Sequence, residues 1–135
     1  MHETVYLNGD LVPLSEAKIS VLDRGFIFGD GVYEVIPAYR RTLFRLKEHL
    51  ARLAYSLAEI RLNNPHDDAT WTRLLQTVVD RNPWDDQSVY LQVTRGVAPR
   101  AQEFPKSRHS SPPAGSRHLL SRIIYPAPRT VCSKG

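Results

Sequence analysis

The sequence predicts one α+β lobe, in which an antiparallel-rich sheet is combined with two helices. Asn8-Gly9 lies between short apolar pairs, and this is a strong hairpin signal because both residues tolerate positive φ. The apolar residues of 46–60 recur at helical spacing. Those of 88–95 alternate with polar residues, as in a half-buried strand.

Strands joined by tight turns are predicted for the first part of the chain. Residues 5–7 and 11–12 flank the Asn-Gly turn, and residues 32–39 are β-branched and aromatic enough to form a longer strand. Pro37 restricts that strand to a place where its missing N–H is not needed in the ladder. The segment 23–31 carries three glycines within seven residues, which indicates tight backbone geometry.

The pattern then changes to helical spacing and back. The apolar stripe of the first predicted helix steps by four and three residues, as one face of an amphipathic helix does. A Pro-His-Asp-Asp break supplies a candidate N-cap for the second helix. From residue 40 onward, the predicted elements are a turn at 40–41, a strand at 42–44, a helix at 47–60 and a helix from the 65–68 break to about residue 82. They are followed by the strand 88–95 and a Gly/Pro loop at 96–100.

The formal net charge of +4 is unevenly distributed. All 14 acidic residues lie between Glu3 and Glu103, so residues 1–106 carry a net −1 and residues 107–135 carry +5. We therefore predict a domain of residues 1–106 followed by a basic Ser/Pro/Arg-rich tail of residues 107–135. The tail is interpreted as a disordered extension, as a nucleic-acid-binding arm, or as the product of a shifted reading frame.

Length and composition exclude several classes of protein. The 135 residues suit one domain, and no run approaches the roughly 18 apolar residues that a membrane-spanning helix needs. The N-terminus does not resemble a signal peptide. Cys132 is the only cysteine, which excludes an internal disulfide and a cysteine-based zinc site and fits the reducing cytoplasm. No metal site is expected.

The candidate polar residues each have a plain structural interpretation beside a functional one. Asp30 and Glu34 form an acid/base pair or are separate solvated or capping carboxylates. The glycines of 23–31 fit no phosphate-binding motif and are only a weak signal for a phosphate cradle. Arg52 lies on the polar side of the first helix as a solvated side chain or an anion ligand.

Two further features have the same ambiguity. His49 is either an ordinary imidazole on the surface or the packed side of the first helix, or a functional group beside that helix. Arg95 and Arg100 flank the Gly/Pro loop after the last strand, where a guanidinium could meet a carboxylate with two hydrogen bonds.

Three segments in register resemble a known family: Asp-Arg-Gly-Phe-Ile-Phe-Gly-Asp-Gly-Val-Tyr-Glu-Val (23–35), Glu-His-Leu-Ala-Arg-Leu (48–53) and Tyr-Leu-Gln-Val-Thr-Arg-Gly-Val-Ala-Pro-Arg (90–100). They are similar to the N-terminal lobe of the fold-type IV, pyridoxal-phosphate-dependent aminotransferases, from about residue 5 to residue 105. The Gly-Asp-Gly-Val-Tyr-Glu segment and the Arg-Gly-x-x-x-Arg loop favour the D-amino-acid (D-alanine) aminotransferase branch. Aminodeoxychorismate lyase and the branched-chain aminotransferases are the alternatives.

The resemblance implies roles for four residues. Arg52 matches the arginine that binds the cofactor phosphate, and Tyr33 matches a tyrosine that lines the cofactor pocket and helps to hold the substrate carboxylate. Arg100 matches the arginine that binds this carboxylate, in the family within the neighbouring subunit of a homodimer. Gln102 stands where the D-amino-acid enzymes have a histidine. Glutamine can donate a hydrogen bond but carries no charge, so the resemblance leaves the substrate preference open.

The resemblance also implies a catalytic lysine that forms a Schiff base with the cofactor. The family carries it in a second lobe, and none of the four lysines matches it; they are Lys18, Lys47, Lys106 and Lys134. The expectation is therefore transamination between an amino acid such as D-alanine and a 2-oxo acid, with pyridoxal 5'-phosphate as cofactor and a truncated chain that is inactive alone. A non-catalytic anion-binding lobe is the alternative.

Overall fold

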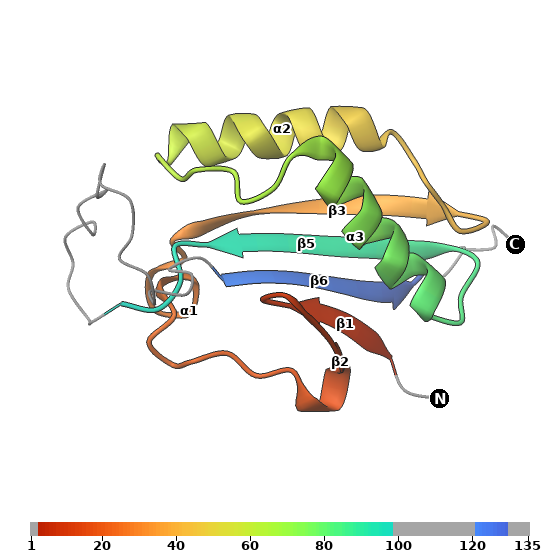
Figure 1. Ribbon diagram of the computed structural model, residues 1–135, viewed down its shortest axis with the longest axis horizontal. Coiled ribbons are helices and arrows are strands. Elements are labelled where there is room, and N and C mark those ends of the chain that lie inside the picture. Colours follow the sequence, from red (N-terminus) through yellow and green to blue (C-terminus); the bar gives the residue numbers. More distant parts are fainter. Residues whose placement is uncertain (1–2, 99–120, 130–135) are drawn as a thin grey trace, which may run out of the picture.

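The computed structural model describes residues 3–98 and 121–129, and in this part of the chain six antiparallel strands form one sheet in the order β2-β1-β6-β5-β3-β4. The two long helices cover one face of this sheet (Figure 1). This confirms the predicted α+β class. The elements are β1 (Thr4–Leu7), β2 (Asp10–Pro13), a 3-10 turn η1 (Leu14–Glu16), α1 (Arg24–Phe28), β3 (Gly31–Tyr39), β4 (Thr42–Leu43), α2 (Leu46–Glu59), α3 (Asp68–Arg81), β5 (Gln87–Thr94) and β6 (Ser121–Pro128).

The predicted N-terminal hairpin forms as β1 and β2. Leu7 pairs with Asp10, and the two residues between them, Asn8 and Gly9, have φ angles of 52° and 111°. Both values lie in the left-handed region, which the two-residue turns of hairpins require and which asparagine and glycine accept at low cost. The Asn-Gly signal therefore indicated the correct position of this turn, and Asp10 belongs to the second strand.

Strand β3 accommodates Pro37 as the sequence predicts. The carbonyl of Pro37 accepts a hydrogen bond from the Phe44 amide at 2.8 Å, so the backbone polar groups of Pro37 face the β4 side. Pairing with β4 begins only at Ala38, and the long ladder with β5 runs along the opposite side. The missing N–H of proline therefore costs no ladder hydrogen bond.

Strand β6 was not predicted. It lies between β1 and β5, and Ile124 pairs with both Tyr6 and Leu91. Ile124 is fully buried in the core. The Ser/Pro/Arg-rich composition of residues 107–135 as a whole concealed this short segment, in which Ile123-Ile124-Tyr125 has the β-branched and aromatic character of a strand.

The core lies between the helices and the sheet. Helix α2 buries Leu50, Leu53 and Leu57, as its periodicity predicts. Helix α3 begins at the predicted cap, where the Asp67 carboxylate accepts a hydrogen bond from the Thr70 amide at 2.8 Å. Its fully buried Trp71 donates from the indole to Asn64 at 2.8 Å. No helix in the described part of the chain has the length and apolar composition needed to cross a membrane.

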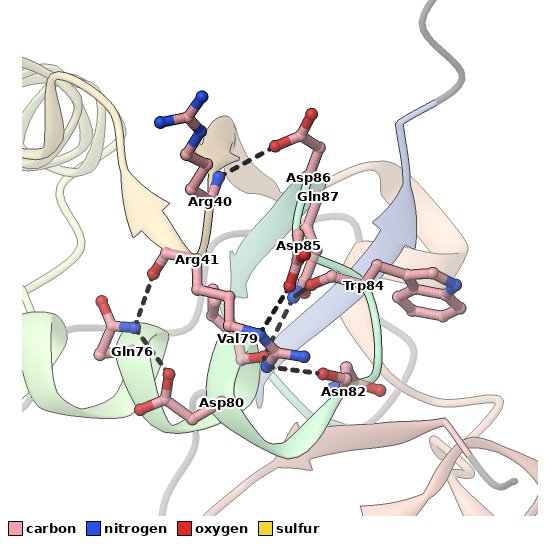
Figure 2. Close-up of polar contacts among 10 residues, drawn as sticks. All are labelled: Arg40, Arg41, Gln76, Val79, Asp80, Asn82, Trp84, Asp85, Asp86 and Gln87. Carbon is pink, nitrogen blue, oxygen red and sulfur yellow. Dashed lines mark hydrogen bonds and ion pairs between the residues drawn. The ribbon is translucent and has the colours of Figure 1, made fainter.

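The predicted turn at 40–41 joins β3 to β4 and is attached to the end of α3 (Figure 2). Arg40 and Arg41 have φ angles of 46° and 65°, which non-glycine residues adopt only with support from their surroundings. Asp86 accepts from the Arg40 amide at 2.9 Å, and the Asp85 carbonyl accepts from the Arg41 amide at 2.7 Å. The Arg41 guanidinium donates to the Asn82 carbonyl at 3.0 Å. Residues far apart in the sequence thus stabilise this turn.

The glycine-rich segment 23–31 contains the short helix α1, which was not predicted. Asp23 caps its first turn by accepting from the Gly25 amide, and Gly29 ends it with a φ of 64°. In Figure 1 this helix lies beside the end of β5. The glycines of this segment are needed for close packing there: a Cβ on Gly25 would lie 2.3 Å from Thr94 Cγ2, and one on Gly31 would lie 2.6 Å from the Val93 carbonyl oxygen. Gly25 and Gly31 therefore allow close packing, whereas Gly29 has open space beside it and supplies the left-handed end of α1.

Candidate functional site

The site centres on Glu34, which β3 directs toward helix α2. The Arg52 guanidinium donates from Nε to Glu34 Oε1 at 2.7 Å and from Nη2 to Oε2 at 2.8 Å. His49 Nδ1 lies 2.8 Å from the same Oε2. His49 and Arg52 are three residues apart and therefore lie on the same face of α2. One strand carboxylate thus orients two side chains of the helix.

Glu34 is ionised in this arrangement. Burial raises the pKa of its carboxyl, but the hydrogen bonds and charges of Arg52 and His49 outweigh burial and hold this pKa below its ordinary value. An ionised carboxylate only accepts hydrogen bonds, so His49 is the donor and its Nδ1 carries the proton. The hydrogen bond to Glu34 in turn raises the pKa of Arg52, so the guanidinium stays cationic.

The two sides of this ion pair differ in exposure. The Glu34 side chain is 3% exposed, whereas that of Arg52 is 65% exposed. Nε and Nη2 of Arg52 are bonded to Glu34, and Nη1 takes part in none of the hydrogen bonds found within the described residues. The guanidinium is therefore held in a fixed orientation and still has N–H groups to offer to an anion.

Tyr33 precedes Glu34 and lies on the opposite face of the sheet, since successive strand side chains alternate. Its side chain is 64% exposed, and its ring stacks on that of Tyr90 with centroids 5.6 Å apart. Strand β4 pairs with β3 only at Ala38 and Tyr39, so at Tyr33 strand β3 is the edge of the sheet. The Tyr33 ring is therefore accessible at this edge of the sheet.

Asp30 and Glu34 do not form an acid/base pair with each other. The Asp30 carboxylate is bonded to Arg24 and Arg95, and that of Glu34 to Arg52 and His49. Arg95, considered above as a carboxylate ligand, is 11% exposed and bonds Asp30 and the Ile60 carbonyl. Arg95 therefore has a structural role in the described part of the chain.

Arg100 and Gln102 lie outside the described residues. So do two of the four lysines, Lys106 and Lys134, while Lys18 and Lys47 are exposed. No group of three or more potential metal-binding side chains was found within residues 3–98 and 121–129.

The ion pairs of Glu34 with His49 and Arg52 were not predicted from the sequence. The sequence nevertheless contains a sign of these ion pairs, because the residues of β3 that face the helices are Glu34, Ile36 and Ala38. A carboxylate in an apolar alternation is rarely buried without a cationic partner. His49 and Arg52 flank the buried Leu50 and Leu53, which places them at the border of the helix face that meets β3.

Comparison with known proteins identifies relatives of the chain. A family model described as amino-transferase class IV matches residues 31–129 and thus extends through β6. D-alanine aminotransferase of Staphylococcus aureus (strain N315) is 43% identical over 103 residues, which are 76% of this chain and 36% of that protein. The D-alanine aminotransferase of Bacillus licheniformis is 47% identical over 100 residues, which are 74% of this chain and 35% of that protein. The chain therefore spans little more than a third of the length of these relatives.

Solved structures of similar fold include two branched-chain aminotransferases. That of Escherichia coli has a TM-score of 0.74 at 22% identity and matches 96% of this chain and 42% of that one. That of Thermoproteus uzoniensis with norvaline has a TM-score of 0.73 at 26% identity and matches 95% of this chain and 41% of that one. The fold likeness thus extends over nearly the whole chain. Because the family model includes Glu34 and Arg52 and covers most of the sequence, the chain belongs to the class IV aminotransferases.

Proposed function

We propose that the chain is the phosphate-binding lobe of a pyridoxal-5'-phosphate-dependent aminotransferase that exchanges the amino group of a D-amino acid, such as D-alanine, with a 2-oxo acid. The exposed Arg52 guanidinium, oriented by the buried Glu34 carboxylate, carries this proposal. The family to which the chain belongs is pyridoxal-phosphate-dependent. The D-alanine aminotransferases at 43% and 47% identity support the D-amino-acid class.

The residues around Arg52 fit the phosphate group of this cofactor. A phosphate is recognised by a planar cationic fork, and Arg52 has one edge bonded to Glu34 and Nη1 left for the ligand. Glu34 fixes the side chain before the ligand arrives, so less rotamer entropy is lost on binding. His49 completes the hydrogen bonds of the Glu34 carboxylate.

Tyr33 is proposed to line the cofactor pocket and to hold the substrate carboxylate. Its ring is supported by stacking on Tyr90, and its side chain is mostly exposed. When bound, pyridoxal phosphate supplies the electron sink through which an amino group passes between an amino acid and an oxo acid. The proposed part of this chain is to bind and orient the cofactor and substrate.

Arg100 and Gln102 are proposed to bind the substrate carboxylate from the segment after Ala98. A guanidinium can bind a carboxylate with two parallel hydrogen bonds, and the amide of Gln102 can add a neutral donor. The enzyme is proposed to be a cytoplasmic homodimer. The single cysteine fits a reducing compartment, and the family resemblance places the carboxylate-binding arginine in the neighbouring subunit.

A second candidate is a non-catalytic anion-binding lobe. The chain spans 36% of the length of the Staphylococcus aureus relative, and no lysine of the sequence matches the catalytic lysine that the family resemblance implies. Both proposals require Arg52 to bind a phosphate, and they differ in whether turnover follows. We expect no pyruvate from D-alanine and 2-oxoglutarate with the 135-residue chain alone. Turnover by this chain would contradict the assignment of the lysine to a second lobe.

The phosphate assignment is tested with 4-deoxypyridoxine 5'-phosphate and 4-deoxypyridoxine, which lack the aldehyde and so do not react with surface lysines. Calorimetry should show the phosphate ester binding about 10- to 100-fold more tightly, as a charge-assisted hydrogen-bonding group does. Arg52→Gln should remove this preference. Arg73→Gln, which changes an exposed arginine of α3, is the matched control and should keep it. Equal binding of the two compounds by the unmodified chain would contradict the proposal.

A further inference from the structure

The turn between β1 and β2 is bonded to the start of β6. The backbone amide of Asn8 donates to the Arg122 carbonyl at 3.0 Å, and the backbone amide of Arg122 donates to Asn8 Oδ1 at 2.7 Å. Leu7, which precedes the turn, pairs with Ile123 of the same strand. In Figure 1 the turn lies beside the end at which β6 begins. The side chain of Asn8 thus extends the contact between β1 and β6 beyond the last paired residue of β1.

Asn8 is followed by glycine, and this exposes its side-chain amide to attack by the main chain. The Gly9 nitrogen can form a bond to Asn8 Cγ and close a succinimide ring, while the side-chain nitrogen leaves as ammonia and takes up the proton of the Gly9 amide. Water then opens the ring at either carbonyl and leaves an aspartyl or an isoaspartyl residue. Glycine has no Cβ to hinder the approach, and a Cβ built on Gly9 would meet no atom within 4 Å. Both residues are exposed, so water reaches the ring.

The other asparagines of the sequence are poorer sites for this reaction. Asn64 and Asn82 each precede a proline, whose nitrogen carries no proton and cannot act as the nucleophile. Asn63 precedes Asn64, whose Cβ hinders the approach of its nitrogen. The chain therefore contains its own controls, and the chemistry of the sequence singles out Asn8.

The pairing with β6 opposes the reaction. The hydrogen bond from the Arg122 amide directs the Asn8 side chain toward β6, so this bond has to break before Asn8 Cγ can turn toward the Gly9 nitrogen. The backbone is restrained as well, because the turn between Leu7 and Asp10 holds the φ of Asn8 at 52°. The reaction therefore proceeds from chains in which β6 has separated from the turn, and the fraction of such chains sets its rate.

We propose that Asn8 is a modification site whose deamidation is controlled by the pairing of β6 with β1. The side chain is held while β6 is paired, and the succinimide forms when β6 separates. An isoaspartyl residue adds one methylene group to the main chain, so the two-residue turn between Leu7 and Asp10 no longer fits and β6 does not pair again as before. The site thus records the separation of β6 in covalent form. This inference is independent of the proposed function, because none of these residues contacts Arg52.

Peptide mapping by mass spectrometry after incubation at mildly alkaline pH tests the site, and methylation by protein L-isoaspartate methyltransferase identifies the isoaspartyl product. Asn8 should deamidate about tenfold or more faster in the chain unfolded in guanidinium chloride than in the folded chain, because the folded chain must first break two hydrogen bonds. Asn64 and Asn82 should stay intact in both. Equal rates at Asn8 in the two states would contradict control by pairing, and an intact Asn8 in the unfolded chain would exclude the site.

Arg122 provides a matched pair of variants. Arg122→Pro removes the N–H that is bonded to Asn8, whereas Arg122→Ala keeps it, and both lose the guanidinium that lies 3.3 Å from His66 Nε2. The N–H and carbonyl of one strand residue point to the same side, so the Arg122 amide faces β1 and proline removes no bond to β5. The folded Arg122→Pro chain should deamidate about two- to tenfold faster than the Arg122→Ala chain. Equal rates in the two folded variants would overturn the proposal.

A second pair of variants decides the question should Arg122→Pro fail to fold. Ile124 of β6 and Leu57 of α2 are both buried, and changing either to valine removes one methylene group from the core. The two chains are compared at equal free energy of unfolding, adjusted with a low concentration of denaturant. Ile124→Val should deamidate faster at Asn8, because it weakens β6 itself. Rates that follow overall stability alone would show that global unfolding controls the site, against the proposal.

The two products separate the effect of the new charge from that of the longer main chain. Asn8→Asp represents the aspartyl product and keeps an acceptor for the Arg122 amide, so the amides of β6 should exchange with solvent as slowly as in the parent. The isoaspartyl chain, isolated by chromatography, should exchange the same amides about tenfold or more faster. Parent-like exchange in the isoaspartyl chain would refute the loss of β6 pairing.

Discussion

Glu34 and Arg52 form an ion pair whose carboxylate is 3% exposed and whose guanidinium is 65% exposed. Two hydrogen bonds of 2.7 and 2.8 Å fix the guanidinium from one edge. The carboxylate is buried because β3 directs it under α2, and the guanidinium is accessible because the helix carries it at the border of its buried face. This difference in exposure makes the pair suitable for binding an anion.

Removing the charge of Glu34 should weaken both folding and anion binding. Glu34→Gln loses the ionic partner of Arg52 and His49, so the free energy of unfolding should fall by about 1–3 kcal/mol. Binding of 4-deoxypyridoxine 5'-phosphate should weaken as well, because Arg52 is no longer held in one orientation. Urea unfolding and calorimetry measure the two effects. Glu48→Gln, which changes an exposed carboxylate of α2 paired with Arg45, should alter neither; equal effects of the two variants would refute this prediction.

Stability should fall in acid because of Asp30 and Glu34. Their hydrogen bonds to arginine, and that of Glu34 to His49, outweigh burial and hold both carboxyl pKa values below the ordinary range in the folded chain. A carboxyl of this kind stabilises the fold fully above its unfolded pKa, and the contribution is lost as the pH falls through the folded pKa. The free energy of unfolding should therefore change little between about pH 7 and 5 and decline below about pH 4. Urea titrations at each pH should show a smaller decline in the Asp30→Asn/Glu34→Gln double variant, and an unchanged decline would rule out these two groups as its source.

Asn82 should be important for joining α3 to the first strand. Its side chain is 2% exposed, accepts from the Thr4 amide at 3.0 Å, and donates to the carbonyls of Thr4 and Val78 at 2.9 and 2.7 Å. Asn82→Ala leaves these groups without partners and should lower the free energy of unfolding by about 2–4 kcal/mol. Thermal unfolding followed by circular dichroism provides the measurement. Asn63→Ala, at an exposed position, is the control, and a comparable loss there would show that the effect does not come from these hydrogen bonds.

Gly25 and Thr94 should be energetically coupled. A Cβ on Gly25 would lie 2.3 Å from Thr94 Cγ2 and 2.8 Å from Thr94 Cβ, so Gly25→Ala should lower stability by about 1–3 kcal/mol through overpacking. Thr94→Ser removes the closer of the two atoms. The double variant should therefore be more stable than the sum of the two single effects predicts, and a thermodynamic cycle measures this difference. Additive effects would show that the two residues relax independently.

The regular elements were largely predictable because they depend on local signals. The Asn8-Gly9 turn, the apolar stripe of α2 and the alternation of β5 each reflect the chemistry of neighbouring residues. Strand β6 was not predictable in this way. Its position between β1 and β5 depends on pairings with strands that are distant in the sequence, and composition averaged over residues 107–135 hid it.

The sequence alone is enough to predict the α+β class, the hairpins and both long helices, and it carries the family resemblance that singled out Arg52 and Tyr33. The pairing of each carboxylate with its cations becomes visible only in the folded chain. Asp30 and Glu34 are four residues apart, yet one is bonded to arginines from α1 and the end of β5 and the other to α2. Ion pairs of this kind depend on the distances between elements that are distant in sequence. Those distances are set when the sheet and helices pack together.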